Sequence, residues 1–122
     1  MVSRVKGKEL GTGHSGLFDW YLQRLSAVVL ACLLPMALML VWWVYDGGWS
    51  QLELLTWLDS FVVRVLHTLL ILALMAHGYV GLKVIFEDYI HTGWRVLLLG
   101  LMLVAMVLFA VWWLALIWAW GG

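Results

Sequence analysis

Three stretches without Asp, Glu, Lys or Arg dominate the sequence: Leu25–Tyr45, Val65–Leu82 and Val96 to the C-terminus. Each approaches or exceeds the roughly 20 residues that an α-helix needs to cross about 30 Å of hydrocarbon. Only 11% of all residues are charged, whereas a soluble domain carries about 25%. The sequence therefore predicts an all-α integral membrane protein with three transmembrane helices in the lipid bilayer, formed as a single domain of residues 1–122.

Helix boundaries follow from glycine, proline and charge. The glycines among residues 1–16 predict an irregular start, so residues 1–21 are expected to form a cytoplasmic tail at the membrane surface. Pro35 removes one backbone hydrogen bond and is expected to kink the first span. The first connection, Asp46–Ser50 followed by Glu53 and Asp59, is acidic. The predicted helices cover about 22–45, 57–88 and 94–120.

The distribution of charge predicts the orientation. With three spans, the N-terminal tail and the second connection share one side, and that side carries six basic residues: Arg4, Lys6, Lys8, Arg24, Lys83 and Arg95. The other side carries Arg64 alone. The positive-inside rule then places the N-terminus in the cytoplasm and the C-terminus on the outer, periplasmic side. A net charge of zero gives no basic patch, so we expect no nucleic-acid partner.

His77 is the main candidate for a functional residue, because a polar side chain within a span has no water to solvate it. On an α-helix, Ala73 and Gly81 lie one turn to either side of His77 and within about 40° of its direction. Small residues on both sides of an imidazole form a slot that suits a flat ligand, and an imidazole can bind haem iron. The alternative is a histidine that only hydrogen-bonds a neighbouring helix.

His67 cannot bind the same iron as His77 from the same helix. It lies about 15 Å away along the helix axis, and its side chain points about 80° away from that of His77 around the axis. We expect His67 to be an interfacial residue; as a ligand it would imply a second haem. The other spans contain methionines and one cysteine but no histidine. A haem with two histidine ligands would therefore take the second one from another polypeptide.

Polar residues gather where the second span ends. Tyr89 can donate a hydrogen bond to a quinone carbonyl, and Asp88 can relay protons. The alternative interpretation is an ordinary interfacial connection with a tyrosine at the membrane boundary.

The sequence resembles the smaller hydrophobic membrane anchor, the D subunit, of bacterial succinate dehydrogenase, respiratory complex II with cytochrome b556. The resemblance rests on the length, the three spans, the segment Asp19-(x)4-Arg24-Leu-Ser-Ala and the pattern His77-(x)3-Gly81-(x)6-Asp88-Tyr89.

This resemblance implies a role for each candidate residue. His77 matches the axial ligand of the iron in haem b, with the other axial histidine supplied by the companion cytochrome b anchor, the C subunit. Gly81 would pack against the haem, and Arg24 matches an arginine near the haem propionates and the quinone pocket. Tyr89 matches a tyrosine that hydrogen-bonds ubiquinone, and Asp88 its neighbouring acid and proton relay.

The resemblance also implies partners and a location. The anchor would dock a flavoprotein subunit with FAD and an iron–sulfur subunit on the cytoplasmic face of the bacterial inner membrane. The chain would hold no catalytic residues of its own, while the complex would oxidise succinate and reduce ubiquinone in the tricarboxylic acid cycle and electron transport. The alternatives are an anchor of a menaquinol-linked fumarate reductase, a haem-free scaffold and a small transporter. Every acidic residue lies outside the three uncharged runs, which disfavours a transporter.

Overall fold

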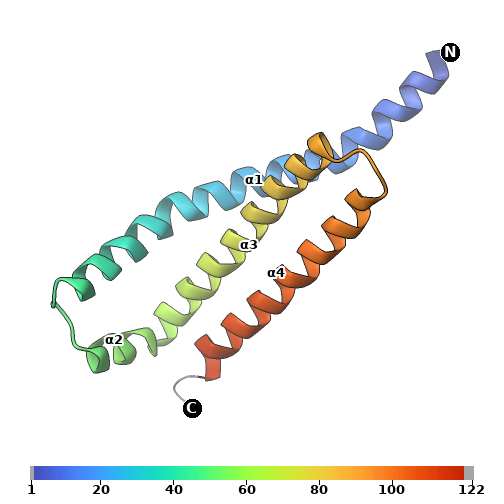
Figure 1. Cartoon of the computed structure of the whole chain (residues 1–122). Helices are drawn as coiled ribbons and strands as arrows, with labels where there is room; N and C mark the ends of the chain where they lie inside the picture. The colour runs from blue at the N-terminus through green and yellow to red at the C-terminus, as the bar shows by residue number, and fades with distance from the viewer. Residues whose placement is uncertain (1, 120–122) are drawn as a thin grey trace.

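The computed structural model describes the backbone of residues 2–119 and the side chains of residues 16–119. Within that part, the chain forms four α-helices and no strand (Figure 1): α1 (Val2–Tyr45), α2 (Gln51–Leu58), α3 (Phe61–Tyr89) and α4 (Trp94–Ala119). Three helical segments are long and apolar enough to cross a membrane: Gly16–Tyr45, Phe61–Tyr89 and Trp94–Ala119. The predicted all-α fold with three transmembrane helices is confirmed.

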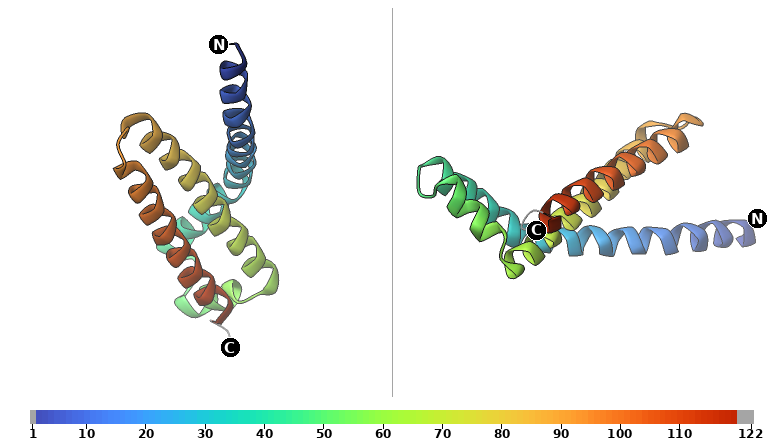
Figure 2. Two further views of the ribbon diagram at one scale, coloured as in Figure 1. Left: turned by 90° about the vertical axis from the view of Figure 1, so that its right-hand side faces the viewer. Right: turned by 90° about the horizontal axis from the view of Figure 1, so that it is seen from below.

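The α3 helix is the centre of the arrangement, because both α1 and α4 pack against it (Figures 1 and 2). Among the described side chains the buried ones are few: Ser26, Ile71, Ala73, Val80 and Ile117. Large apolar side chains stay exposed on all three long helices. Exposed apolar surface of this extent marks contact with lipid or with other proteins. Because both α1 and α4 pack against α3, a site between the helices is positioned by α3.

The first helix begins much earlier than the sequence predicts. The glycines predict irregular structure for residues 1–16, yet α1 begins at Val2 and continues unbroken to Tyr45. Each interior glycine costs a helix about 1 kcal/mol relative to alanine. Nucleation is the expensive step of helix formation, whereas extending an existing helix gains one hydrogen bond for each residue fixed. The membrane-spanning part supplies the nucleus, so the helix propagates back through the glycines. It also continues through Pro35 and changes direction along its length (Figure 2).

The second helix begins later than predicted, because a separate short helix precedes it. The span expected from about residue 57 begins at Phe61, and α2 occupies Gln51–Leu58. Ser50 starts α2 with a capping box: the Glu53 N–H donates to Ser50 Oγ at 3.3 Å, and Ser50 N–H donates to Glu53 Oε2 at 2.7 Å. The Ser-x-x-Glu spacing is a sequence signature of a helix start. The spacing of Ser50 and Glu53 could therefore have predicted the start of α2 from the sequence.

The capping box makes the stability of α2 depend on pH. The Ser50 backbone N–H and hydroxyl donate to the Glu53 carboxylate, and they lower the pKa of Glu53 below its usual value of 4.5. A depressed folded-state pKa stabilises the helix fully above pH 4.5, and that stabilisation is lost as the pH falls through the lower value. We expect hydrogen-exchange protection of α2 amides, corrected for intrinsic rates, to fall in this acid range. Glu53→Gln should remove this dependence; unchanged protection in the unsubstituted protein would contradict it.

Candidate functional site

The His77 side chain lies in the interface between α3 and α1. Its Nδ1 is 3.2 Å from the hydroxyl oxygen of Ser26 on α1. Ser26 is the one buried polar side chain among those described, with 4% of its surface exposed. The Ser26 hydroxyl also donates to the main-chain carbonyl of Gln23, at 3.0 Å. The packing of the two helices therefore holds one nitrogen of the imidazole in place.

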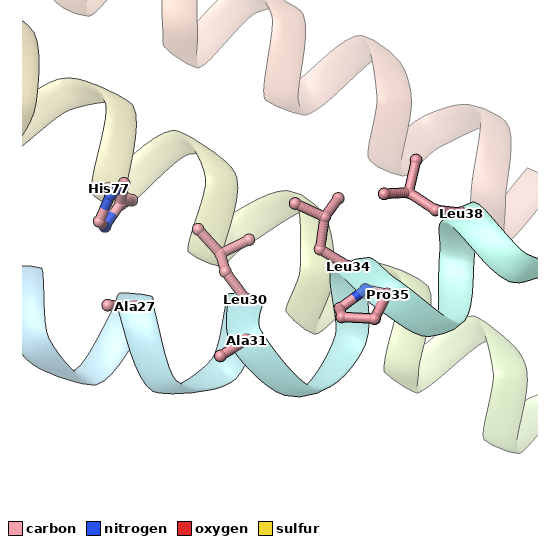
Figure 3. Close-up of a pocket in the computed structure, with 7 residues that line it drawn as sticks. All are labelled: Ala27, Leu30, Ala31, Leu34, Pro35, Leu38 and His77. Carbon is pink, nitrogen blue, oxygen red and sulfur yellow. The ribbon is translucent and has the colours of Figure 1, made fainter.

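A groove of about 340 Å³ opens beside the imidazole along α1 (Figure 3). The residues that line it are Ala27, Leu30, Ala31, Leu34, Pro35, Leu38 and His77. Several of the α1 residues among them are exposed, so the groove is accessible from the molecular surface. His77 is its one polar side chain. An apolar groove with a single convergent polar group is suited to a flat, largely apolar ligand.

The open space around His77 differs in part from the predicted slot. A side-chain carbon added at Gly81 would meet nothing within 4 Å, so the Gly81 side is open as expected. Ala73 is 6% exposed and belongs to the buried core, so the space does not continue on that side. The groove extends instead along α1, whose lining residues sequence reasoning missed. Ala27, Ala31 and Pro35 recur at intervals of four residues, the spacing of one helix face, and this pattern was the available signal.

A second contact between α1 and α3 lies toward the end of the bundle where α3 ends. Lys83 Nζ donates to Asp19 Oδ2 at 2.8 Å, and the two side chains are only 21% and 24% exposed. The sequence places Lys83 on the basic side of the membrane, and the structure directs its side chain to α1. Lys83 follows His77 by about 9 Å along the helix axis. The ion pair therefore fixes the same helix pair that holds His77 against Ser26.

Removing this ion pair should loosen the packing of α1 on α3. For Lys83→Met or Asp19→Asn we expect a loss of about 1 kcal/mol, because each leaves a partly exposed charged partner unpaired. Thermal unfolding of the detergent-solubilised assembly would measure it. The exchange variant Asp19→Lys/Lys83→Asp should recover part of the loss, whereas no recovery in this variant would show that the ion pair does not stabilise the packing.

The remaining candidate residues lie on exposed surface. Arg24 is exposed, with its guanidinium carbon 5.5 Å from the Trp20 ring centroid, in a cation–π contact. Asp88 and Tyr89 are exposed at the end of α3, and Tyr89 is 81% exposed. The structure thus brings together His77 and Ser26, and it leaves Arg24, Asp88 and Tyr89 accessible to molecules outside this chain.

His67 takes part in packing at the opposite end of the bundle. Trp113 on α4 donates its indole N–H to His67 Nε2 at 2.9 Å, and Trp118 donates to the Thr68 hydroxyl at 3.0 Å. Nearby, Arg64 forms an ion pair with Asp59. These contacts occupy one ring nitrogen of His67 and support its interpretation as a packing residue near the membrane boundary. In the part of the chain that the structure describes, no three His, Cys, Asp or Glu side chains are grouped so that they could hold a metal ion.

The fold and the site define a multi-pass membrane protein with an imidazole held between two of its spans. Residues 4–117 match the family described as the succinate dehydrogenase/fumarate reductase transmembrane subunit, and the chain belongs to this family. It is similar to the succinate dehydrogenase hydrophobic membrane anchor subunit of Rickettsia bellii, with 28% identity over 87 residues, or 70% of this chain and 67% of the relative. The protein of the same name from Rickettsia typhi is 25% identical over 88 residues, or 71% and 68% of the two chains. The chain is a transmembrane anchor of this type.

Proposed function

We propose that this chain is the anchor of a succinate:quinone oxidoreductase that supplies one axial ligand of haem b and part of a ubiquinone site. The observation that carries the proposal is the His77 imidazole, held by Ser26 beside an open apolar groove. In this proposal the chain has the D-subunit role, in the bacterial cytoplasmic membrane. The names of both relatives favour succinate oxidation over menaquinol-linked fumarate reduction.

The residues present fit a haem. Nδ1 of His77 is engaged by Ser26, while its Nε2 has no hydrogen bond among the described residues, so Nε2 is available to iron. The groove is apolar and is open along α1 and beside Gly81, which suits the face of a porphyrin. When bound, haem supplies reversible one-electron transfer at its iron. His77 would orient the group, and the apolar lining of the groove would contact its face.

The second axial histidine would come from the companion cytochrome b anchor, the C subunit. His77 is the single histidine in the groove, and the other lining residues, all from α1, are apolar. The open edge of the groove leaves room for a second polypeptide to cover the ligand. The exposed apolar faces of α1 and α4 are available for the same assembly.

The quinone would bind near the end of α3 that carries Tyr89. In this proposal the exposed Tyr89 hydroxyl donates a hydrogen bond to a quinone carbonyl, and the exposed Asp88 beside it relays protons. Arg24 lies on the exposed surface of α1, where its charge can pair with a propionate or polarise the quinone pocket. The excess of basic residues at this end indicates the cytoplasmic side. The flavoprotein and iron–sulfur subunits would dock there and deliver electrons from succinate.

The test is the reduced-minus-oxidised absorption spectrum of the purified complex, recorded for the unsubstituted protein, His77→Ala and His67→Ala. We expect a b-type signal that His77→Ala loses and His67→Ala retains, with flavin content unchanged in all three. A full b-type signal in an assembled His77→Ala complex would overturn the ligand assignment. Absence of haem from the unsubstituted complex would instead favour a haem-free anchor.

A further inference from the structure

We propose that Ser26 is a positioning residue for the haem site: its hydroxyl fixes the His77 tautomer that leaves Nε2 free for iron, and it strengthens the imidazole as a ligand. The inference rests on the proposed function, because it concerns the same histidine.

The assignment follows from counting protons. A serine hydroxyl has a single hydrogen, and in Ser26 it is donated to the carbonyl of Gln23 at 3.0 Å. Serine in a helix commonly makes this bond to the carbonyl three or four residues earlier. Toward Nδ1 of His77, at 3.2 Å, the Ser26 oxygen can then only accept. Nδ1 therefore carries the hydrogen, and Nε2 of the neutral ring presents its lone pair.

The opposite tautomer would not serve a metal in the groove. If Ser26 donated to Nδ1, the hydrogen of the neutral ring would lie on Nε2 and block that atom as a ligand. The Gln23 carbonyl would also lose its bond from the hydroxyl.

Burial makes this hydrogen bond effective. Ser26 is 4% exposed, so water has little access to the hydroxyl. In surroundings of low dielectric constant a hydrogen bond is electrostatically stronger than in water. The bond also joins α1 to α3, two helices that pack against each other. Ring orientation is therefore set by helix packing, before any ligand binds.

The consequence is a lower haem midpoint potential. An acceptor on Nδ1–H increases electron density on the imidazole and raises its basicity as a ligand. A stronger donor stabilises the ferric iron more than the ferrous iron, and so lowers the potential. Loss of the Ser26 oxygen should raise the midpoint potential and change the ferric electron paramagnetic resonance (EPR) spectrum, which reports ligand strength and ring orientation.

The experiment is a redox titration and a ferric EPR spectrum of the purified complex for the unsubstituted protein, Ser26→Ala, Ser26→Thr and Ser26→Cys. We expect Ser26→Ala to retain haem with a raised midpoint potential and a shifted spectrum. Ser26→Thr keeps the hydroxyl and should match the unsubstituted protein. Ser26→Cys keeps the shape with a weaker acceptor and should give a smaller shift in the same direction.

An unchanged potential and EPR spectrum in Ser26→Ala would overturn the inference. If Ser26→Ala fails to assemble, Ser26→Cys decides: a potential equal to that of the unsubstituted protein would overturn it. The His77→Ala spectrum separates this outcome from failure of the proposed function. Haem retained in His77→Ala overturns both, whereas haem lost in His77→Ala with Ser26 variants unchanged overturns only the role of Ser26.

Discussion

Ala27→Phe is expected to abolish haem binding without removing α1 or α3 from the membrane. Ala27 lines the groove directly beside His77 (Figure 3). A phenyl ring at this position takes up space in a groove of about 340 Å³. It would occupy the space beside the imidazole that the porphyrin needs. Phenylalanine is apolar like the alanine that it replaces, so the span keeps its hydrophobic length.

The measurement is the molar ratio of haem to flavin in the purified complex. Ala105→Phe is the matched control, because Ala105 is an exposed alanine on α4 and does not line the groove. We expect the control to keep the haem-to-flavin ratio of the unsubstituted protein and Ala27→Phe to lose haem almost completely. A normal ratio in Ala27→Phe would show that the ligand does not lie in this groove.

The three spans could be predicted from the sequence because hydrophobic length is a property of each segment by itself. The boundaries were less well predicted. The glycines before residue 16 indicated irregular structure, but α1 begins at Val2, since extension from a stable span outweighs local propensity. Ser50 and Glu53 carried the signal for α2, a helix of eight residues whose start depends on local side-chain hydrogen bonds.

The contacts that build the site could not be predicted in the same way. Ser26 and His77 lie 51 residues apart in the chain, and Asp19 and Lys83 lie 64 apart. Helical periodicity shows which residues share a face of one helix, but not which faces of two helices meet. His77 was identified because it is a polar residue inside a span. Its partner Ser26 is small and common in such spans, so only the packing of α1 on α3 distinguishes it.

Tyr89→Phe is expected to lower quinone reductase activity by about fivefold to about 140-fold. Loss of one hydrogen bond to the bound quinone costs about 1–3 kcal/mol, and each 1.4 kcal/mol corresponds to about a tenfold change in rate. Phenylalanine keeps the ring and removes only the hydroxyl. Succinate oxidation with an artificial acceptor takes electrons before they reach the quinone, so this activity should be unchanged in the same preparation.

Tyr45→Phe is the matched control, because Tyr45 is 85% exposed against 81% for Tyr89 and ends α1 rather than α3. Loss of the hydroxyl there should leave both activities unchanged. Equal loss of both activities in Tyr89→Phe would point to a defect in docking the catalytic subunits and would contradict a direct contact with quinone. A selective loss at Tyr89 would place the quinone at the end of α3 that also carries the Asp19–Lys83 ion pair. Together with loss of haem from His77→Ala, that result would show that α3 supplies both the haem ligand and the quinone contact, at opposite ends of the segment from His77 to Tyr89.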